Sequence, residues 1–390
     1  AEARSLAGID LRVAGGLDTK NALGLIGFTE WVEKELSKGP FDVTLSVSSS
    51  VPADVIQPRS GTVKEALDRR VAIRKSFYGR WMKRFEIWAS MKRQTLLAAE
   101  KKILQSESVR RIVPISQYVA DQLHRHYRIP PRRIRTIFNC AQIVPLDEQM
   151  RAIYRRQIRS ELQIDQEAVV FLFAALDPKL KGLDILLQAM KKLADERDDV
   201  CLMIAGTTSA WHRKLSQRLG LEDRVRWLGS VQEMERYYAA ASVTVLPTWF
   251  DSSSRVVLES LMHSVPAIST LFDGSAQWIY RPDGSETIPG PYQRDLGDLV
   301  YNDRSAGRVL RCPENVGALK RAMEQLCDPA VRKACASHAA GLWDQVDFDR
   351  HLDQLEEVLF EAADKKPPER GRRSPDEAQS EVTSIARSPS

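Results

Sequence analysis

Two carboxylates and a run of serines lie where a predicted strand gives way to a predicted helix. Residues 243–247 are apolar and rich in β-branched side chains, and residues 255–262 carry apolar side chains at helical spacing. Asp251 and the serines at 252–254 lie between them, and Glu259 follows on the helix. A helix N-terminus attracts anions, and carboxylates beside it could accept hydrogen bonds from sugar or ribose hydroxyls. On spacing alone, a capping aspartate and a solvated glutamate is the simpler interpretation.

A second polar loop separates the predicted strand 168–174 from the predicted helix 185–193. It contains Lys179 and Lys181, and Gly182 follows directly. Cations at a strand-to-helix turn can neutralise the charge that develops on a departing diphosphate. Solvation alone would also explain a lysine in a loop.

The spacing Asp251-x(7)-Glu259, followed by Pro266 and Gly274, resembles the acidic motif of retaining GT-B glycosyltransferases. The resemblance implies that Glu259 binds the ribose of a nucleotide and that Asp251 lies beside the donor sugar. It also implies that Lys181 binds the donor diphosphate.

The same resemblance extends to the rest of the donor site. It implies that backbone near residues 227–229 holds the nucleobase, and that the N–H groups at residues 253–255 stabilise the diphosphate together with Lys181. Transfer by this route needs neither a protein nucleophile nor a metal ion. We predict Lys181 and Asp251 as catalytic residues. The predicted donor-binding residues are Lys179, Ser253, Ser254, Arg255, Glu259, Trp227 and Gly229.

Four positions depart from the family pattern. Ala175 and Leu180 occupy places where an arginine is usual, Ser264 stands where glycine is usual, and Gln277 stands where a glutamate often closes the motif. Residues 1–123 contain no histidine, although related enzymes often have one in their first domain.

The chain has 390 residues, of which 43% are hydrophobic, and this suits two domains of ordinary size. The resemblance implies an α/β fold of the GT-B class, in which two Rossmann-like domains face each other across a cleft. We place an acceptor-side domain at 1–145 and expect it to be incomplete, because its opening glycine-rich turn is not found. The donor-binding domain is placed at 146–345, a helix returning to the first domain at 346–364, and a disordered tail at 365–390.

Residues 64–102 form a basic and aromatic insert. Arginines and lysines alternate there with Phe77, Tyr78, Trp81, Phe85 and Trp88. This pattern suits an amphipathic helix on an anionic membrane surface. A solvated basic face above a buried aromatic core and, less favoured, nucleic-acid binding are the alternatives. The net charge is only +5, and we predict a membrane contact and no nucleic-acid partner.

The remaining composition indicates a cytoplasmic protein. Five cysteines are scattered without C-x-x-C spacing, which favours reduced thiols over disulfides or a zinc site. The D-x-D pattern at 347–349 precedes a predicted helix and is explained by helix capping. No apolar run reaches the ~18 residues that a membrane span requires.

We therefore expect a bacterial retaining hexosyltransferase, most similar to the lipopolysaccharide core glucosyltransferases. It would move a hexose from a nucleotide-diphosphate sugar, UDP-glucose, to a glycan or glycolipid acceptor at the inner face of the cytoplasmic membrane, without metal or cofactor. Two other classes stay open: a non-catalytic GT-B-shaped protein that binds sugar nucleotides or membranes, and a sugar-nucleotide epimerase. Release of UDP only in the presence of an acceptor would distinguish the transferase from both.

Overall fold

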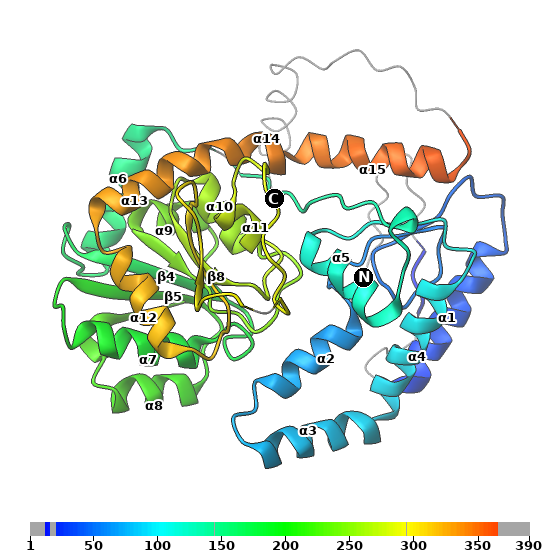
Figure 1. Cartoon of the computed structure of the whole chain (residues 1–390), viewed down its shortest axis with the longest axis horizontal. Helices are drawn as coiled ribbons and strands as arrows, with labels where there is room; N and C mark the ends of the chain where they lie inside the picture. Colours follow the sequence, from blue (N-terminus) through cyan, green and yellow to red (C-terminus); the bar gives the residue numbers. More distant parts are fainter. Residues whose placement is uncertain (1–11, 16–20, 144, 294, 366–390) are drawn as a thin grey trace.

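The fold is α/β, as predicted, with a large and a small sheet flanked by helices (Figure 1). The computed structural model describes residues 12–15, 21–143, 145–293 and 295–365. Apart from Lys365, the predicted tail lies outside the described residues. Within the described residues, no helix combines the length and the apolar character that crossing a bilayer requires.

The large sheet has seven strands in the order β6-β5-β4-β7-β8-β10-β9. Every neighbouring pair is parallel except β10 and β9. The strands are β4 (Val169–Ala175), β5 (Val200–Gly206), β6 (Val225–Gly229), β7 (Val243–Val245), β8 (Ala267–Thr270), β9 (Leu299–Val300) and β10 (Gly307–Leu310). Because the parallel strands share one direction, their carboxyl ends lie along one edge of the sheet.

Helices cover both faces of this sheet, so its strands are apolar on both sides. Phe171 and Phe173 of β4 pack into the cluster on one face, whereas Val170 and Leu172 pack into the cluster on the other. All four side chains are fully buried. The helices are α6 (Glu148–Glu161), α7 (Leu183–Ala194), α8 (Ala210–Arg218), α9 (Met234–Ala240), α10 (Arg255–Met262), α11 (Ala276–Tyr280), α12 (Val316–Gln325), α13 (Pro329–His338) and α14 (Trp343–Val346).

The small sheet has three parallel strands in the order β1-β2-β3, and each strand has two residues. Its strands are β1 (Leu45–Ser46), β2 (Val55–Ile56) and β3 (Arg111–Ile112), and the helices around it are α1 (Ala22–Leu36), α2 (Val63–Ala72), α3 (Phe77–Ala89), α4 (Met91–Gln105) and α5 (Gln117–Tyr127). The strand predicted at 41–47 is thus much shorter than expected. It ends where the Ser46 hydroxyl donates to the carbonyl of Ser48 and accepts from its N–H, which forms a turn.

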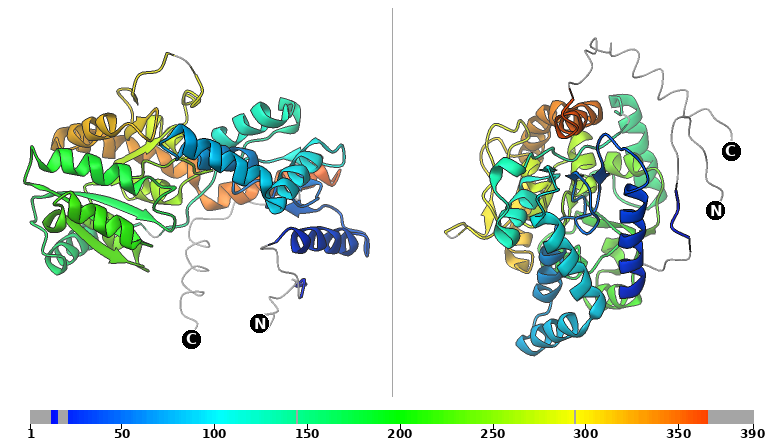
Figure 2. Two further views of the ribbon diagram at one scale, coloured as in Figure 1. Left: turned by 90° about the horizontal axis from the view of Figure 1, so that it is seen from below. Right: turned by 90° about the vertical axis from the view of Figure 1, so that its right-hand side faces the viewer.

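Helix α3 lies at the lower edge of the molecule in Figure 1 and in the right-hand view of Figure 2. None of its residues is buried. Its five aromatic side chains are between 54% and 86% exposed. The alternative interpretation, in which these rings fill a core, is therefore wrong.

Helix α15 (Phe348–Ala362) carries the chain from the large sheet back to the small one (Figure 1). The Asp347 carboxylate accepts a hydrogen bond from the N–H of Arg350 at 2.8 Å, so capping does explain the D-x-D pattern. Val358 packs in a cluster with Val55 and Val113 of the small sheet region.

The large sheet should determine the stability of its half of the chain. Leu202 is fully buried in β5, whereas Leu176 is 85% exposed. We expect Leu202→Ala to lower the free energy of unfolding by about 2–5 kcal/mol, because it leaves a cavity in the core. Leu176→Ala makes the same change on the surface and should shift the free energy of unfolding by less than ~0.5 kcal/mol. Urea denaturation followed by circular dichroism measures both, and equal midpoints would contradict this packing.

Candidate functional site

The predicted site residues lie in loops and helix starts at the carboxyl edge of the large sheet. Lys181 follows β4, Trp227 and Gly229 end β6, and Asp251 follows β7. Ligands of open parallel sheets bind at this edge, where the loops present free backbone groups. Residues that are far apart in sequence can therefore meet here.

Lys181 and Asp251 form an ion pair, with 2.5 Å between Nζ and Oδ2. The ammonium also donates to the carbonyl of Phe250 at 3.0 Å. Gly182 makes this approach possible, since its φ is +77° and a Cβ there would lie 2.2 Å from the Pro247 carbonyl oxygen. The structure thus brings the two predicted catalytic residues into direct contact.

The serine run starts α10, with the Ser254 hydroxyl accepting from the N–H of Val257. The N–H of Ser253 donates to Asp251 Oδ1 at 3.2 Å, and the N–H of Ser254 donates to Asp273 Oδ1 at 3.1 Å. Two of the three N–H groups expected to face a diphosphate are therefore engaged by carboxylates. In the part of the chain that the structure describes, the N–H of Arg255 has no such partner.

Asp273 is a site residue that the motif did not reveal. Its Oδ1 also accepts from the N–H of Ser275 at 2.9 Å, and its Oδ2 accepts from the Ser269 hydroxyl at 2.7 Å. Burial and the nearby charge of Asp251 raise the pKa of Asp273 to about 7, although these hydrogen bonds oppose the shift. Its position within the segment 267–277 was visible, but its role depends on contacts that sequence spacing does not encode.

Glu259 is held from two sides. Its Oε1 pairs with Arg255 at 3.0 Å, one helical turn earlier, and its Oε2 accepts from the Tyr238 hydroxyl at 3.0 Å. Tyr238 stacks on His263 with 5.4 Å between the ring centroids. Burial raises the pKa of Tyr238 well above its usual value and lowers the pKa of His263 to about 4, so both rings are neutral at pH 7. Neither aromatic residue was predicted from the sequence.

Three predicted donor-binding residues lie apart from this group. Trp227 contacts Arg213, whose guanidinium carbon is 4.9 Å from the ring centroid. Gly229 adopts a positive φ of +70°, and a Cβ there would have no neighbouring atom within 4 Å. Lys179 is exposed and lines a small cavity together with Arg70 of α2 and Lys83 of α3.

The first half of the chain contacts the site through residues 252–254, which we call the serine loop. The Ser116 hydroxyl donates to the Ser252 carbonyl at 2.6 Å, and the Ser252 hydroxyl donates to the Arg59 carbonyl at 2.6 Å. Asn139 donates to the Ser253 carbonyl at 3.3 Å. Gly274 permits this junction, because a Cβ there would lie 2.3 Å from the Ser116 hydroxyl oxygen.

Leu180, one of the departures from the family pattern, has a structural role at this junction. It packs against Tyr118 of α5 together with Phe250 and Phe272 of the large-sheet loops. An apolar contact between the two halves therefore occupies the place where an arginine is usual.

Two further departures also fit their surroundings. The Gln277 amide donates to the carbonyl of Glu286 at 2.7 Å and accepts from the N–H of Ile288 at 2.9 Å. A glutamate, which has no donor when ionised, could not make the first contact. Ser264 takes a left-handed conformation, with φ of +57°, as the glycine it replaces would do more easily.

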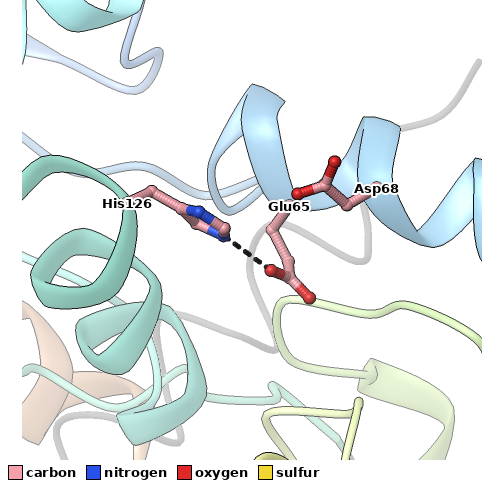
Figure 3. Close-up of side chains that lie close together, drawn as sticks. All are labelled: Glu65, Asp68 and His126. Carbon is pink, nitrogen blue, oxygen red and sulfur yellow. Dashed lines mark hydrogen bonds and ion pairs between the residues drawn. The ribbon is translucent and has the colours of Figure 1, made fainter. Parts of the chain in front are cut away.

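A buried carboxylate, Glu65, lies on α2 outside this group. It pairs with His126 Nε2 at 2.7 Å (Figure 3). It also accepts hydrogen bonds from the hydroxyl of Tyr118, at 3.0 Å, and from the hydroxyl of Tyr292. Burial alone would raise the pKa of Glu65, but hydrogen bonds from His126, Tyr292 and Tyr118 together hold it below its usual value. These contacts tie the loop around Tyr292 to α2 and α5.

Asp68 lies near this pair (Figure 3), and Glu65, Asp68 and His126 could offer three ligand atoms within 4.8 Å of one another. Each of them already has a partner. The Asp68 carboxylate pairs with Lys64 at 2.6 Å, and Glu65 and His126 bind each other. The geometry is thus accounted for by hydrogen bonds and ion pairs within the chain.

Known proteins resemble this chain in sequence. Residues 167–290 match the family described as glycosyl transferases group 1. D-inositol 3-phosphate glycosyltransferase of Streptomyces scabiei is 28% identical over 209 residues, which cover 49% of this chain and 46% of that protein. Lipopolysaccharide glucosyltransferase WaaG of Escherichia coli is 23% identical over 282 residues, which cover 69% of this chain and 70% of that protein.

Two solved structures share the architecture. The crystal structure of WaaG, a glycosyltransferase involved in lipopolysaccharide biosynthesis, has a TM-score of 0.63 at 19% identity and covers 90% of this chain and 86% of its own. Anabaena HepE in complex with UDP and glucose has a TM-score of 0.55 at 15% identity and covers 79% of this chain and 78% of its own.

The chain has the GT-B fold, as the sequence predicted. The match to the glycosyl transferases group 1 family lies within the half of the chain that contains the large sheet. The match to the Streptomyces scabiei relative spans about half of that protein's length, at 46%.

The raised pKa of Asp273 predicts a pH dependence of stability. The folded chain keeps the Asp273 proton up to about pH 7, whereas an unfolded aspartate loses it near pH ~3.9. The resulting stabilisation is complete below about pH 4 and is lost as the pH rises to about 7. Asp273→Asn cannot titrate and can keep these contacts, with its amide donating to Ser269. The free energy of unfolding of wild type minus that of this variant should therefore fall between pH 4 and 7 in urea titrations.

The exposed Asp303→Asn controls for the loss of one charge, because it changes a surface carboxylate. The free energies of unfolding of wild type and Asp273→Asn are compared between pH 4 and 7. If their difference does not change over this range, the assignment of the proton to Asp273 is wrong.

Proposed function

We propose that the protein is a retaining glycosyltransferase that moves a hexose from a nucleotide-diphosphate sugar, UDP-glucose, to a glycan or glycolipid acceptor at a membrane of the bacterial envelope. The observation that carries the proposal is the contact between Lys181 and Asp251 beside the N-terminus of α10. The names of the relatives, and the UDP and glucose in the HepE complex, support it.

Lys181 would bind the donor diphosphate. An ammonium has three N–H donors, and the structure uses two of them, for Asp251 and for the Phe250 carbonyl. The third is left for a phosphate oxygen, and the N–H of Arg255 at the start of α10 would add a second donor. These groups would neutralise the charge that develops as the bond to the sugar breaks. The proposed reaction therefore needs no metal ion.

Asp251 would orient the donor sugar. Its carboxylate lies between the cation of Lys181 and the N–H of Ser253, which fix both oxygens while leaving lone pairs for sugar hydroxyls. The acceptor hydroxyl would attack from the face that the diphosphate leaves, which retains the anomeric configuration. Glu259, held by Tyr238 and Arg255, would accept hydrogen bonds from the ribose.

Helix α3 would bring the enzyme to its acceptor. Its rings follow one another along the helix, with centroids 6.1 Å apart for Trp81 and Phe85 and 5.6 Å apart for Phe85 and Trp88. Arg80 and Arg84 lie on the same helix and are exposed. Exposed aromatic rings and cations on one helix suit insertion at the headgroup level of an anionic membrane. The protein would thus be cytoplasmic and peripheral at the inner leaflet.

The donor site can be tested by calorimetric titration of UDP, UDP-glucose and GDP-mannose into the full chain without metal. We expect one uridine ligand to bind at micromolar concentration. Lys181→Ala should weaken it by at least about tenfold, since a charge-assisted hydrogen bond contributes about 1.5–3 kcal/mol. Lys214→Ala removes an exposed lysine of α8 and should leave the affinity unchanged.

Turnover distinguishes the three classes. A transferase releases UDP from UDP-glucose only when a glycan or glycolipid acceptor is added, an epimerase converts the sugar without an acceptor, and a non-catalytic protein leaves UDP-glucose unchanged in both cases. If none of the three nucleotides binds, the proposed function is wrong.

The membrane contact can be tested by co-sedimentation with vesicles. Wild type should bind phosphatidylglycerol vesicles more strongly than phosphatidylcholine vesicles. Trp81→Ser/Trp88→Ser should weaken binding by about tenfold or more, since burying one large apolar side chain contributes about 1.5–3 kcal/mol. Trp211→Ser alters an exposed ring on α8 and serves as the control. Equal binding by all three proteins would exclude α3 as the contact.

A further inference from the structure

A small cavity lies between the α2–α3 region and the loop that joins β4 to α7. Its volume is about 80 Å³. The residues that line it include Arg70, Ile73, Arg74, Lys83, Asp177 and Lys179. We call this cavity the basic notch. It is formed by both halves of the chain, since Lys179 and Asp177 belong to the second half and the others to the first.

Positive charge dominates the basic notch. Four of its residues are cations and one is a carboxylate. Lys83 has a partner, Glu86, at 2.7 Å. Within the described residues, the side chains of Arg70, Arg74 and Lys179 make no hydrogen bond or ion pair. Three cations without partners repel one another, and an anion bound among them would relieve that repulsion.

The side chains of the two lysines in the loop 177–182 lie in different sites. Asp177 Oδ1 accepts from the N–H of Leu180 at 3.1 Å, and its carbonyl accepts from the N–H of Lys181 at 3.0 Å, which fixes the turn. Lys181 then reaches Asp251, whereas Lys179 lines the basic notch. The notch is therefore next to the donor site without sharing the lysine that would bind the diphosphate.

The size of the notch restricts its ligand. Pockets for whole small molecules usually measure about 300–1,000 Å³, and 80 Å³ is far smaller. One compact anionic group fits this space, whereas a sugar nucleotide does not. Two guanidinium groups beside an ammonium favour a phosphate in particular, because arginine offers paired N–H donors to two phosphate oxygens.

We propose that the basic notch binds a phosphate group of the acceptor, so that the acceptor class of this enzyme is a phosphorylated sugar or a glycolipid phosphate. The proposal rests on the proposed transferase function, which it deepens. Three cations hold the phosphate from both halves of the chain, and α3 beside it would keep this group at the level of a membrane surface. Acceptor binding would then join α2 and the β4–α7 loop across the site.

Calorimetry with a soluble probe tests the notch directly. Glucose 6-phosphate should bind the full wild-type chain, and glucose should give no binding signal. Arg70→Gln/Lys179→Gln removes one cation from each side of the notch and should weaken binding of glucose 6-phosphate by tenfold or more. Lys214→Gln/Arg218→Gln removes the same charge from exposed positions of α8, outside both the notch and α3, and should stay within twofold of wild type.

A lipid phosphate is tested with vesicles of phosphatidylcholine containing phosphatidic acid. If Arg70→Gln/Lys179→Gln loses tenfold in vesicle binding relative to its charge-matched control, the notch takes a lipid phosphomonoester. If it loses tenfold only with glucose 6-phosphate, the acceptor phosphate is on a soluble sugar. If neither probe separates the two double variants, the proposal is wrong.

UDP binding separates this proposal from the donor site. Arg70→Gln/Arg74→Gln removes two cations of the notch and leaves Lys179 and Lys181 of the β4–α7 loop intact, so it should bind UDP as wild type does. If UDP affinity falls tenfold as well, the notch serves the donor diphosphate and the acceptor proposal is overturned. If wild type does not bind UDP at all, the proposed function fails, and this result is independent of the difference seen with glucose 6-phosphate.

Discussion

The buried carboxyl group of Asp273 holds together the two loops that form the candidate site. It accepts hydrogen bonds from the N–H groups of Ser254 and Ser275 and from the Ser269 hydroxyl, and no solvent competes there because the residue is only 2% exposed. The start of α10 is fixed by these bonds, and with it the serine loop that Asp251 and the first half of the chain contact. The position of Glu259 on α10 relative to the loop that carries Asp251 therefore depends on one buried acid.

Much of the large sheet could be predicted because its strands are buried on both faces and its helices are amphipathic. The bounds of α10 are those that the apolar pattern predicts, and the bounds of β4 and α7 differ by only one or two residues from the predicted strand 168–174 and the predicted helix 185–193. Lys181 and Asp251 each belong to a motif that follows a parallel strand. Both strands end at the same edge of the large sheet, which explains why the two residues meet. In contrast, Asp273 and Tyr238 could not be predicted, because their roles come from hydrogen bonds to groups distant in sequence.

The first half of the chain was harder to predict for two physical reasons. Its strands have two residues each, too few for a pattern of period two to be recognised. The aromatic and basic spacing of α3 is the same whether the rings face a core or the outside, and only the fold shows that they are exposed. The departures at Leu180 and Gln277 were visible in the sequence, but the contacts that explain them were not.

The returning helix α15 limits how the two halves can move. Besides its apolar contacts, α15 is bound to the first half by the ion pair between Glu357 and Arg135 and by His351, whose Nδ1 lies 2.8 Å from the Phe138 carbonyl oxygen. The chain therefore crosses between the halves twice, once after Phe138 and once before α15. A movement of one half relative to the other must therefore preserve both connections, and it must break the hydrogen bonds that join Ser252 to Ser116 and Arg59.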